Sequence, residues 1–152
     1  MYLEEHAIFR SAFRKFLERE IVPCLEAWER DGIVPRDAWR KMGASGFLCP
    51  WMPEEYGGSG ADFLYSVIIN EEISRAGAVS LMATLHSDII APYLHHLGTE
   101  EQKARWLPKC ATGEIRGRRP RSSRSRRGGN RTSRSPRRPL IPRRSSTACP
   151  GT

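Results

Sequence analysis

The stretch that decides the fold runs from residue 47 to residue 108 and reads FLCPWMPEEYGGSGADFLYSVIINEEISRAGAVSLMATLHSDIIAPYLHHLGTEEQKARWLP. It opens with a loop rich in proline and glycine, residues that separate helices rather than fill a core. A helix is predicted over residues 62–76, because apolar residues recur there at near-helical spacing and Gly77 supplies a stop.

Between residues 78 and 97, apolar side chains occur on nearly every face, and one stripe contains Leu81, Leu85, Ile89, Tyr93 and Leu97. A helix that is apolar all round is buried in a larger protein or crosses a membrane. Polar residues interrupt this segment too often for a membrane span. The segment is therefore predicted to be a central buried helix, bent at Pro92, which lacks a backbone donor.

Further helices are predicted on both sides of this stretch. Residues 4–21 form an amphipathic pattern in which Arg10 and Arg14 face water. A short helix is expected over residues 35–42, with Gly43 just beyond its end. Thr99 and Gln102 have the spacing of a capping box. No convincing strand alternation occurs up to Ile115, so residues 1–115 are predicted to be all-α. The predicted buried stripe of the first helix comprises Ile8, Phe9, Ala12, Phe13, Phe16, Leu17 and Ile21.

Charge divides the chain into two segments. Residues 1–115 contain 12 Lys and Arg and 17 Asp and Glu, a net charge of −5. Residues 116–152 contain 13 Arg and no acidic residue, a net charge of +13, and the two sums return the +8 of the whole chain. The second segment has few apolar residues and no periodicity, so it is predicted to be a disordered tail. We expect a helical domain over residues 1–115 and a tail over residues 116–152.

The cysteines and histidines show no metal-binding spacing. Cys24, Cys49, Cys110 and Cys149 form no CxxC pair, and reduced thiols are favoured over a disulfide framework. The adjacent pair His95 and His96 has no suitably spaced third ligand and is interpreted as a polar helix end. The first twenty residues are charged and amphipathic, unlike a signal peptide, so a cytoplasmic location is predicted.

Six motifs in order carry a family resemblance: EEHAIFRSAFRKFLEREIVP, WRKMGASGFL, PEEYGGSG, NEEISRAG, the segment from residue 78, and GTEEQKARWLPKCATGEI. They cover roughly residues 3–115. This part of the chain resembles the N-terminal helical domain of acyl-CoA dehydrogenases of the long-chain type. Motifs in a shared order and spacing are more specific than any single motif.

The resemblance implies an oxidoreductase of fatty-acid β-oxidation. In that family a glutamate removes the α-hydrogen of a fatty acyl-CoA as a proton, and the β-hydrogen passes to FAD as a hydride. The family also uses an electron-transfer acceptor and forms homo-oligomers. Its N-terminal domain supplies one wall of the acyl-chain pocket. By resemblance, that wall falls on Met82, Ala83, His86, Ser87 and Ile90.

Each candidate residue also has an ordinary structural interpretation. The five wall positions lie on one face of a helix, which suits either a pocket or plain core packing. For His86, a hydrogen-bonded core histidine is favoured over a working one. Glu71 and Glu72 are adjacent on a helix and do not share a face, and Glu71 with Arg75 is expected to form an ordinary i,i+4 ion pair, so an acid–base pair is disfavoured. The glycine loop over residues 57–60 lacks the lysine of a phosphate-binding loop and is interpreted as a tight turn.

The family pattern stops after Ile115. In the family, TGEI is followed at once by a β-domain with a TEPGAGSD-like motif that contacts the flavin, whereas here RGRR follows. Of the 37 tail residues, 34 are of types encoded with G or C at the second codon position, which favours a frameshift in a GC-rich gene over an evolved tail. The chain is then a truncated fragment, inactive alone, without the catalytic glutamate or the flavin site.

A non-enzymatic alternative remains. The helical part would serve as a scaffold, and the arginine-rich tail would bind nucleic acid or another polyanion through counterion release.

Overall fold

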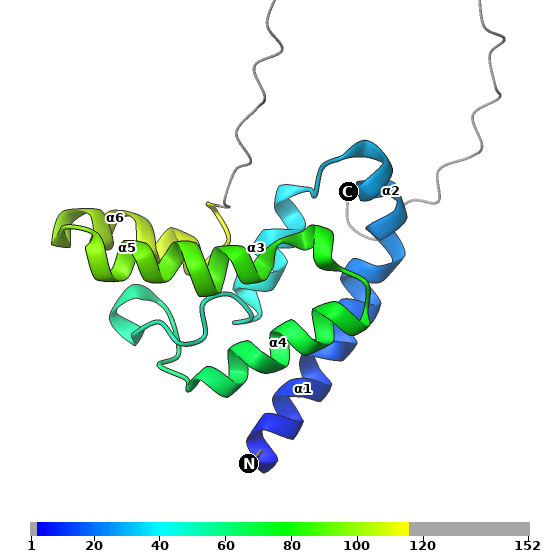
Figure 1. Ribbon diagram of the computed structural model, residues 1–152, viewed down its shortest axis with the longest axis horizontal. Helices are drawn as coiled ribbons and strands as arrows, with labels where there is room; N and C mark the ends of the chain where they lie inside the picture. Colours follow the sequence, from blue (N-terminus) through cyan, green and yellow to red (C-terminus); the bar gives the residue numbers. More distant parts are fainter. Residues whose placement is uncertain (1–2, 116–152) are drawn as a thin grey trace, which may run out of the picture. The chain divides into compact units, whose positions relative to one another are not determined.

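The computed structural model describes residues 3–115, and the predicted tail lies outside the described residues. Within residues 3–115 every regular element is helical, which confirms the all-α prediction (Figure 1). The α-helices are α1 (Glu4–Phe16), α2 (Leu25–Asp31), α3 (Arg36–Ala44), α4 (Phe63–Arg75), α5 (Ala91–Leu97) and α6 (Glu100–Ala111). The shorter elements are π-helical turns at Leu17–Ile21 and Leu85–Ile90 and 3₁₀ turns at Val22–Cys24, Glu54–Tyr56 and Val79–Leu81.

The first helix is more irregular than its amphipathic pattern predicts. α1 passes into the π-helical turn Leu17–Ile21. A 3₁₀ turn that contains Pro23 follows, and α2 begins directly after it. Its buried stripe is also narrower than predicted, because Ile8 and Ala12 are exposed. One flank of α1 packs against α4, so only the side chains that face α4 or the core beneath α1 are buried.

Local sequence signals set the ends of α4 and α6, and of these the Gly77 stop and the Thr99 capping box were predicted. The Asp62 side chain caps α4 by accepting a hydrogen bond from the Leu64 amide over 2.8 Å. Gly77 has a φ of +68°, a left-handed conformation that favours glycine and lets the chain turn back. At the start of α6, Thr99 and Gln102 form the reciprocal capping box. α6 continues through Pro108 to Ala111.

The segment from residue 78 to 97 is not one regular helix. A 3₁₀ turn comes first, and Met82 then takes the left-handed φ of +57° before the helix proper begins. The π-helical turn Leu85–Ile90 follows and leads directly into α5. At its end the Ala91 amide donates to the His86 carbonyl, five residues back. The turn thus lies just before Pro92, which has no amide to donate to an α-helical ladder.

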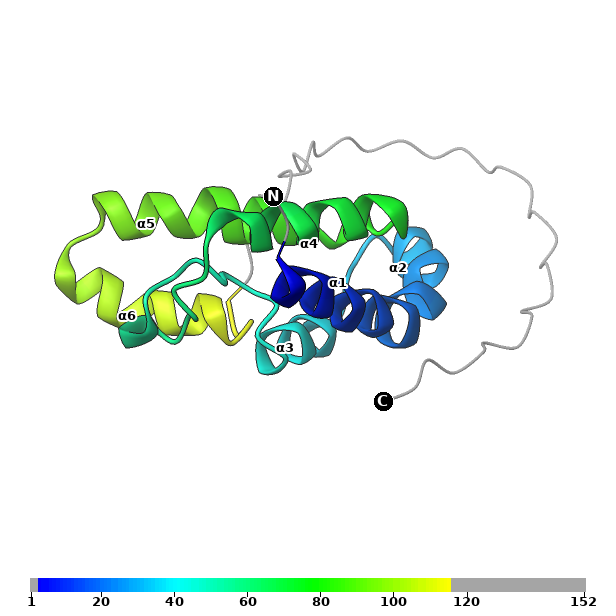
Figure 2. The same ribbon diagram turned by 90° about the horizontal axis from the view of Figure 1, so that it is seen from below.

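Two apolar clusters form the interior. The larger joins α1, α3 and α4, where the Phe13 and Phe47 rings meet edge to face with centroids 4.8 Å apart. The smaller lies under the 47–56 loop, α5 and α6 and includes Met52 and Leu107. Ala83 belongs to the first cluster and Ala91 to the second, so the π-helical segment passes from one core to the other. α5 and α6 lie side by side in both views (Figures 1 and 2).

Two glycines are required by close packing between α3 and the end of α6. Gly43 was predicted to stop the short helix, but α3 continues through it to Ala44. A side chain at Gly43 would collide with the Thr112 backbone, so glycine here permits a close approach. Gly113 has a φ of +72°, and a side chain there would collide with the Trp39 carbonyl.

Candidate functional site

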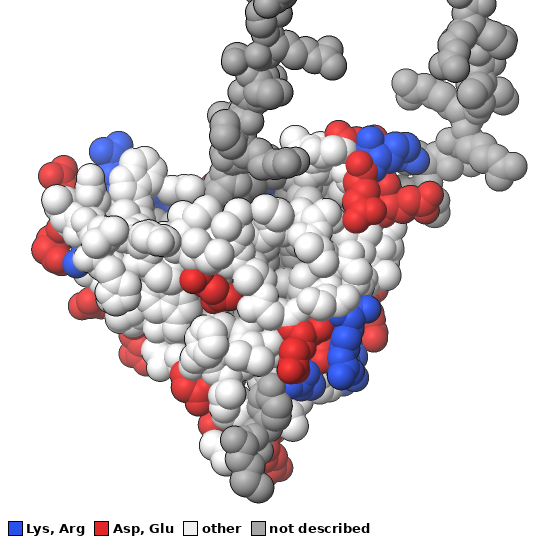
Figure 3. Space-filling view, in the orientation of Figure 1, with Lys and Arg blue, Asp and Glu red and all other residues white. Residues whose placement is uncertain are grey.

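An uncovered row of large apolar side chains is the main surface feature of the described domain. We call it the apolar stripe: Val79, Met82, Leu85, Ile89, Tyr93 and Leu97. These side chains are between 36% and 77% exposed. Over α5 the surface is mostly free of charge, whereas an acidic patch lies near the centre of this face and acidic and basic atoms cluster over part of α4 (Figure 3). The prediction of a fully buried central helix is therefore wrong for this face, because within residues 3–115 no other element covers it.

Two hollows follow the stripe. The first has a volume of about 340 Å³, and Val79, Met82, Leu85 and Ile89 contribute apolar walls to it. Its other lining residues are Asn70, Ile73, Ser74, Ala83 and Thr84. The second has a volume of about 420 Å³ and shares Ile89 with the first; it is lined further by Asp88, Pro92, Tyr93, His96 and Leu97. An apolar trough with a few polar groups is therefore open along this face.

The five predicted wall residues do not share one environment. Met82 and Ile90 are 42% and 38% exposed, and Met82 lines the first hollow. Ala83 is buried but also borders that hollow. His86 and Ser87 are buried and point into the domain. The structure thus brings Met82 and Ala83 to the trough and turns His86 and Ser87 away from it.

Buried His86 connects the segment to both α3 and α6. Its Nε2 lies 3.0 Å from the Cys110 carbonyl oxygen, so Nε2 carries the proton and donates. Its ring also meets the Trp39 ring edge to face, with centroids 5.2 Å apart. Burial lowers the pKa of His86, although the Cys110 carbonyl opposes that shift. A neutral, packed and hydrogen-bonded imidazole agrees with the core interpretation favoured from the sequence.

Ser87 anchors the loop that precedes the glycine turn. Its hydroxyl accepts a hydrogen bond from the Cys49 amide over 3.2 Å, and its carbonyl accepts one from Trp51 Nε1 over 2.7 Å. Cys49 has a φ of +50°, unusual for a residue with a side chain. Ser87 therefore fixes a loop of unusual backbone conformation against the π-helical turn.

A polar network beneath the trough was not predicted. The Asn70 amide donates to the Ser66 carbonyl over 3.0 Å and to Asp88 Oδ2 over 3.1 Å, while its oxygen accepts from the Thr84 hydroxyl. The other carboxylate oxygen, Asp88 Oδ1, is buried and has no hydrogen-bond partner among residues 3–115. These contacts join α4 to the π-helical turn across up to 18 residues of sequence, so no local pattern reveals them.

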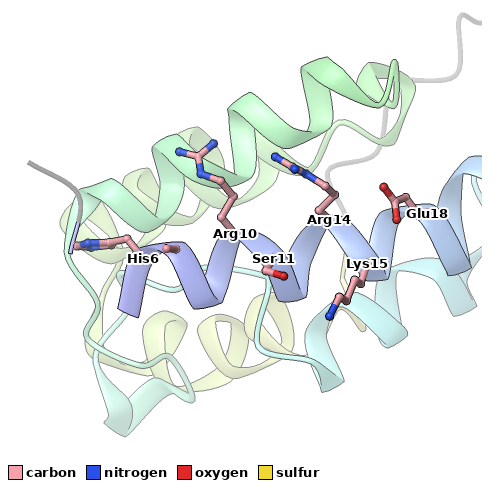
Figure 4. A pocket seen from close by; sticks show the side chains of 7 residues that line it. His6, Arg10, Ser11, Arg14, Lys15 and Glu18 are labelled. Atoms are coloured by element: carbon pink, nitrogen blue, oxygen red, sulfur yellow. The ribbon is translucent and has the colours of Figure 1, made fainter. Parts of the chain in front are cut away.

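A second polar cluster joins α1 to α4. Arg14 donates to Glu72 from Nε over 2.8 Å and from Nη2 over 2.9 Å, and Arg10 Nη1 donates to Glu72 over 3.0 Å. Arg10 also lies 2.6 Å from Glu71. Figure 4 shows Arg10 and Arg14 extending from α1 toward α4, whereas Lys15 points the other way. Arg14 is 46% exposed, as predicted, whereas Arg10 is only 21% exposed, and the buried carboxylate that both arginines hold was not predicted.

This cluster is structural. Hydrogen bonds from Arg14, opposed by burial and aided by Arg10, lower the pKa of Glu72 to about 2. A carboxylate this firmly ionised makes a poor general base or acid near neutral pH. Glu71 and Glu72 balance the charges of Arg10 and Arg14, so the shallow pocket along α1 in Figure 4 is not an evident anion site.

The glycine loop is a tight turn, as interpreted from the sequence. The amides of residues 57–61 donate to backbone carbonyls of residues 50–54 over 2.9 to 3.3 Å. A side chain at Gly58 would collide with the Met52 carbonyl. Hydrogen bonds within the loop therefore occupy these amides, so they are not available to bind a phosphate.

Neither a metal cluster nor a spanning helix is found in the described part. Among residues 3–115, no three His, Cys, Asp or Glu side chains lie together as metal ligands. His95 packs instead edge to face against Trp51, with ring centroids 5.6 Å apart. Over the same residues, no helix is both long enough and apolar enough to cross a membrane.

The fold defines the class of protein: a helical domain with an open apolar trough on one face. Residues 3–114 match the model of the acyl-CoA dehydrogenase N-terminal domain. The chain belongs to the acyl-CoA dehydrogenase family, of which residues 3–114 form the N-terminal domain.

Relatives and solved structures agree with this assignment. The mitochondrial long-chain specific acyl-CoA dehydrogenase of Rattus norvegicus is 37% identical over 117 residues, covering 77% of this chain and 27% of the relative. An acyl-CoA dehydrogenase structure from Geobacillus kaustophilus has 57% identity and a TM-score of 0.72, over 75% of this chain and 30% of that one. One from Bacillus anthracis, complexed with FAD, has 33% identity and a TM-score of 0.65, over 74% of this chain and 20% of that one. The chain spans about a quarter of the length of the curated relatives.

Proposed function

We propose that residues 3–115 contribute the N-terminal helical domain of an FAD-dependent acyl-CoA dehydrogenase and that the trough along the apolar stripe forms one wall of its acyl-chain site. The observation that carries the proposal is the trough itself, whose walls are Val79, Met82, Leu85 and Ile89. Its apolar length suits a fatty chain, and family membership supplies the reaction: α,β-dehydrogenation of a fatty acyl-CoA.

Within the proposed site, Met82 and Ala83 contact the acyl chain, whereas Ile90 is partly exposed but is not among the residues that line either hollow. His86 and Ser87 act indirectly, because they fix the π-helical turn against α6 and the 47–52 loop. We therefore assign them positioning roles rather than contacts with substrate. The oxidoreductase chemistry requires groups beyond this wall, since no residue of the trough is placed as a general base.

The described residues do not fit FAD. The loop amides donate to backbone carbonyls, and Arg10 and Arg14 are paired with glutamates, so no cradle for a pyrophosphate is evident among residues 3–115. We propose that FAD, the electron-transfer acceptor and the homo-oligomer contacts of the family depend on parts other than this domain. The chain alone should then show no flavin absorbance band after gel filtration and no acyl-CoA-dependent dye reduction.

Photoaffinity labelling tests the wall assignment. The full chain is irradiated with a long-chain acyl-CoA that carries a diazirine at the end of its acyl chain, and labelled peptides are identified by mass spectrometry. Labels should concentrate in residues 79–97 and disappear when Met82→Glu places a charge in the trough. Ile8→Glu, an equally drastic change at an exposed apolar position of α1, serves as the matched control. Labels spread evenly over the chain, or retained in Met82→Glu, would contradict the assignment.

A second candidate function is polyanion binding by the basic segment, residues 116–152. Its thirteen arginines favour binding to polyanions, including nucleic acid, as predicted from the sequence. This segment lies outside the described residues. The cytoplasmic location also stays a prediction. The expectation of reduced thiols holds for Cys49 and Cys110, whereas Cys24 is disulfide-bonded.

A further inference from the structure

One carboxylate lies in the apolar trough. Asp88 lines the second hollow together with Ile89, Tyr93 and Leu97, and no lysine or arginine is among the described residues that line either hollow. Its Oδ2 accepts a hydrogen bond from the Asn70 amide over 3.1 Å, whereas its buried Oδ1 has no hydrogen-bond partner within residues 3–115. The walls of the trough therefore supply no cation that would neutralise this charge.

We propose that Asp88 selects among acyl chains: the trough takes chains that end in a methyl group and disfavours chains that end in a carboxylate, as in acyl-CoA derivatives of dicarboxylic acids. This inference rests on the proposed function, since it requires that the trough holds an acyl chain. A site can discriminate by placing a like charge against the unwanted ligand as well as by favouring its competitor. Asp88 is then a specificity-determining residue that takes no part in the reaction.

The charge of Asp88 also orients the chain in the trough. The two hollows share Ile89, so a chain that fills both has one end in each. The CoA end carries phosphate groups, and in the second hollow those anions would lie beside Asp88. The far end of the chain therefore lies in the second hollow, next to Asp88 and the apolar side chains of Tyr93 and Leu97.

Two features of the second hollow make an added carboxylate unfavourable. Its walls are mostly apolar and offer few hydrogen-bond donors to replace lost water, and Asp88 Oδ1 already lacks a donor. Two like charges also repel each other more strongly where apolar side chains displace part of the surrounding water. A methyl end meets neither obstacle and gains contact with the apolar walls.

The nearby polar groups do not form a site for a second carboxylate. Asn70 already donates both amide hydrogens, one to the Ser66 carbonyl and one to Asp88. His96 lines the second hollow, and its ring packs edge to face against that of His95, with centroids 5.1 Å apart. The test is made at about pH 8, where imidazole side chains as a class are mostly neutral, so that a histidine cation does not mask the effect of Asp88.

The test compares two acyl-CoA photoprobes of equal length, one ending in a methyl group and one in a carboxylate, each with a diazirine near that end. The full chain is titrated with each probe, and labelling of residues 79–97 yields a Kd for each. The wild-type chain should bind the methyl-ended probe at least about tenfold more tightly. Both probes carry the same CoA group, and each variant differs from wild type at one position, so the ratio of the two Kd values isolates that position.

Asp88→Asn removes the charge and keeps an oxygen that can accept from Asn70, so the Kd ratio should fall to within about threefold. The matched control is Glu26→Gln, which removes one negative charge from an exposed residue of α2. α2 lies at the opposite end of the domain from α5 in both views (Figures 1 and 2), so this ratio should equal that of wild type. Leu97→Lys adds a cation to the second hollow at a side chain that is 77% exposed, and it should lower the ratio while Asp88 stays in place.

Each failure has its own signature. If neither probe labels residues 79–97 of the wild-type chain, the proposed function fails and the role of Asp88 fails with it. If the methyl-ended probe labels them but Asp88→Asn leaves the Kd ratio unchanged, the role of Asp88 alone is overturned. Equal falls in Asp88→Asn and Glu26→Gln would assign the discrimination to the net charge of the domain and would also overturn it. If circular dichroism shows that Asp88→Asn is unfolded, Leu97→Lys decides, and an unchanged ratio there overturns the proposal.

Discussion

Glu72 of α4 and Arg14 of α1 form a two-pronged ion pair, with Nε–Oε2 and Nη2–Oε1 distances of 2.8 and 2.9 Å. The carboxylate is 2% exposed, whereas the Arg14 side chain is 46% exposed. This pair connects residues 58 positions apart and orients α1 on α4. A buried charge held in this way stabilises the native arrangement only as long as its partners remain.

Replacing Glu72 by Gln should lower the free energy of unfolding by about 2–3 kcal/mol, because Arg10 and Arg14 lose their shared carboxylate but can partly rehydrate. Urea denaturation followed by circular dichroism measures the change. The matched control is Glu71→Gln, whose side chain is 44% exposed and which should cost less than about 1 kcal/mol. Equal losses in the two variants would show that burial of Glu72 has no special role.

The same carboxylate predicts a dependence of stability on pH. Its pKa falls from 4.5 to about 2 on folding, so the unfolded chain binds the proton more readily between these values. The stabilisation from Glu72 is therefore complete above about pH 4.5 and is lost as pH falls toward 2. The difference in unfolding free energy between wild type and Glu72→Gln should shrink over this range. A difference that stays constant from pH 6 to pH 2.5 would contradict the lowered pKa.

Two glycines with the same φ allow the cost of a left-handed backbone to be measured apart from the cost of a steric collision. Gly46 and Gly113 both have a φ of +72°, but only at Gly113 would a side chain meet other atoms, those of Trp39 and Arg40. Gly46→Ala should cost about 1–2 kcal/mol from the left-handed conformation alone. Gly113→Ala should cost about 1–3 kcal/mol more, because the Trp39 backbone must move. Thermal and urea unfolding of both variants measure the two costs, and equal costs would exclude the close contact.

The uncovered stripe should bind hydrophobic dye and favour aggregation of the isolated chain. Changing Met82 and Ile90 together to Gln should lower dye fluorescence and light scattering, since both are partly exposed large apolar side chains of the segment that carries the stripe. Leu3→Gln with Ile8→Gln, also at exposed positions, is the control and should change either signal less. A wild-type chain that binds no dye, stays monomeric and melts in one sharp transition would show that these helices close their own core.

The gene sequence tests the frameshift hypothesis. Translation of the DNA beyond codon 115 in the other two frames should recover a TEPGAGSD-like segment if one base was gained or lost there. The reason is compositional: 34 of the 37 residues after Ile115 belong to types with G or C at the second codon position. Failure to recover such a segment in either frame would leave an evolved basic tail as the explanation.

Local signals in the sequence predicted the helical class, the capping box at Thr99 and the turn at Gly77. Each of these depends on residues within a few positions of one another, so a sequence pattern contains the whole cause. The resemblance identified the domain for a different reason, because ordered motifs over residues 3–115 are rarely shared by chance.

Features that join distant residues could not be read from the sequence. The partners of Arg10 and Arg14 lie about 60 positions away, and both arginines were expected on a solvent-facing side of an amphipathic helix. Leu85 and Ile89 were expected to be buried, since apolar character does not show whether another element covers a side chain. Periodicity likewise placed Met82 and His86 on one wall, but the left-handed turn at Met82 and the π-helical turn separate their environments.

The π-helical turn Leu85–Ile90 also bears on how this family can change in length. A π turn holds one residue more than an α turn, and here it lies between Ala83 in one core and Ala91 in the other. Deleting one residue within it would yield an ordinary α turn, with both alanines still anchored. We therefore expect insertions and deletions of single residues among homologues to be tolerated at this turn, where they would alter the contour of the trough without rebuilding the domain beneath it.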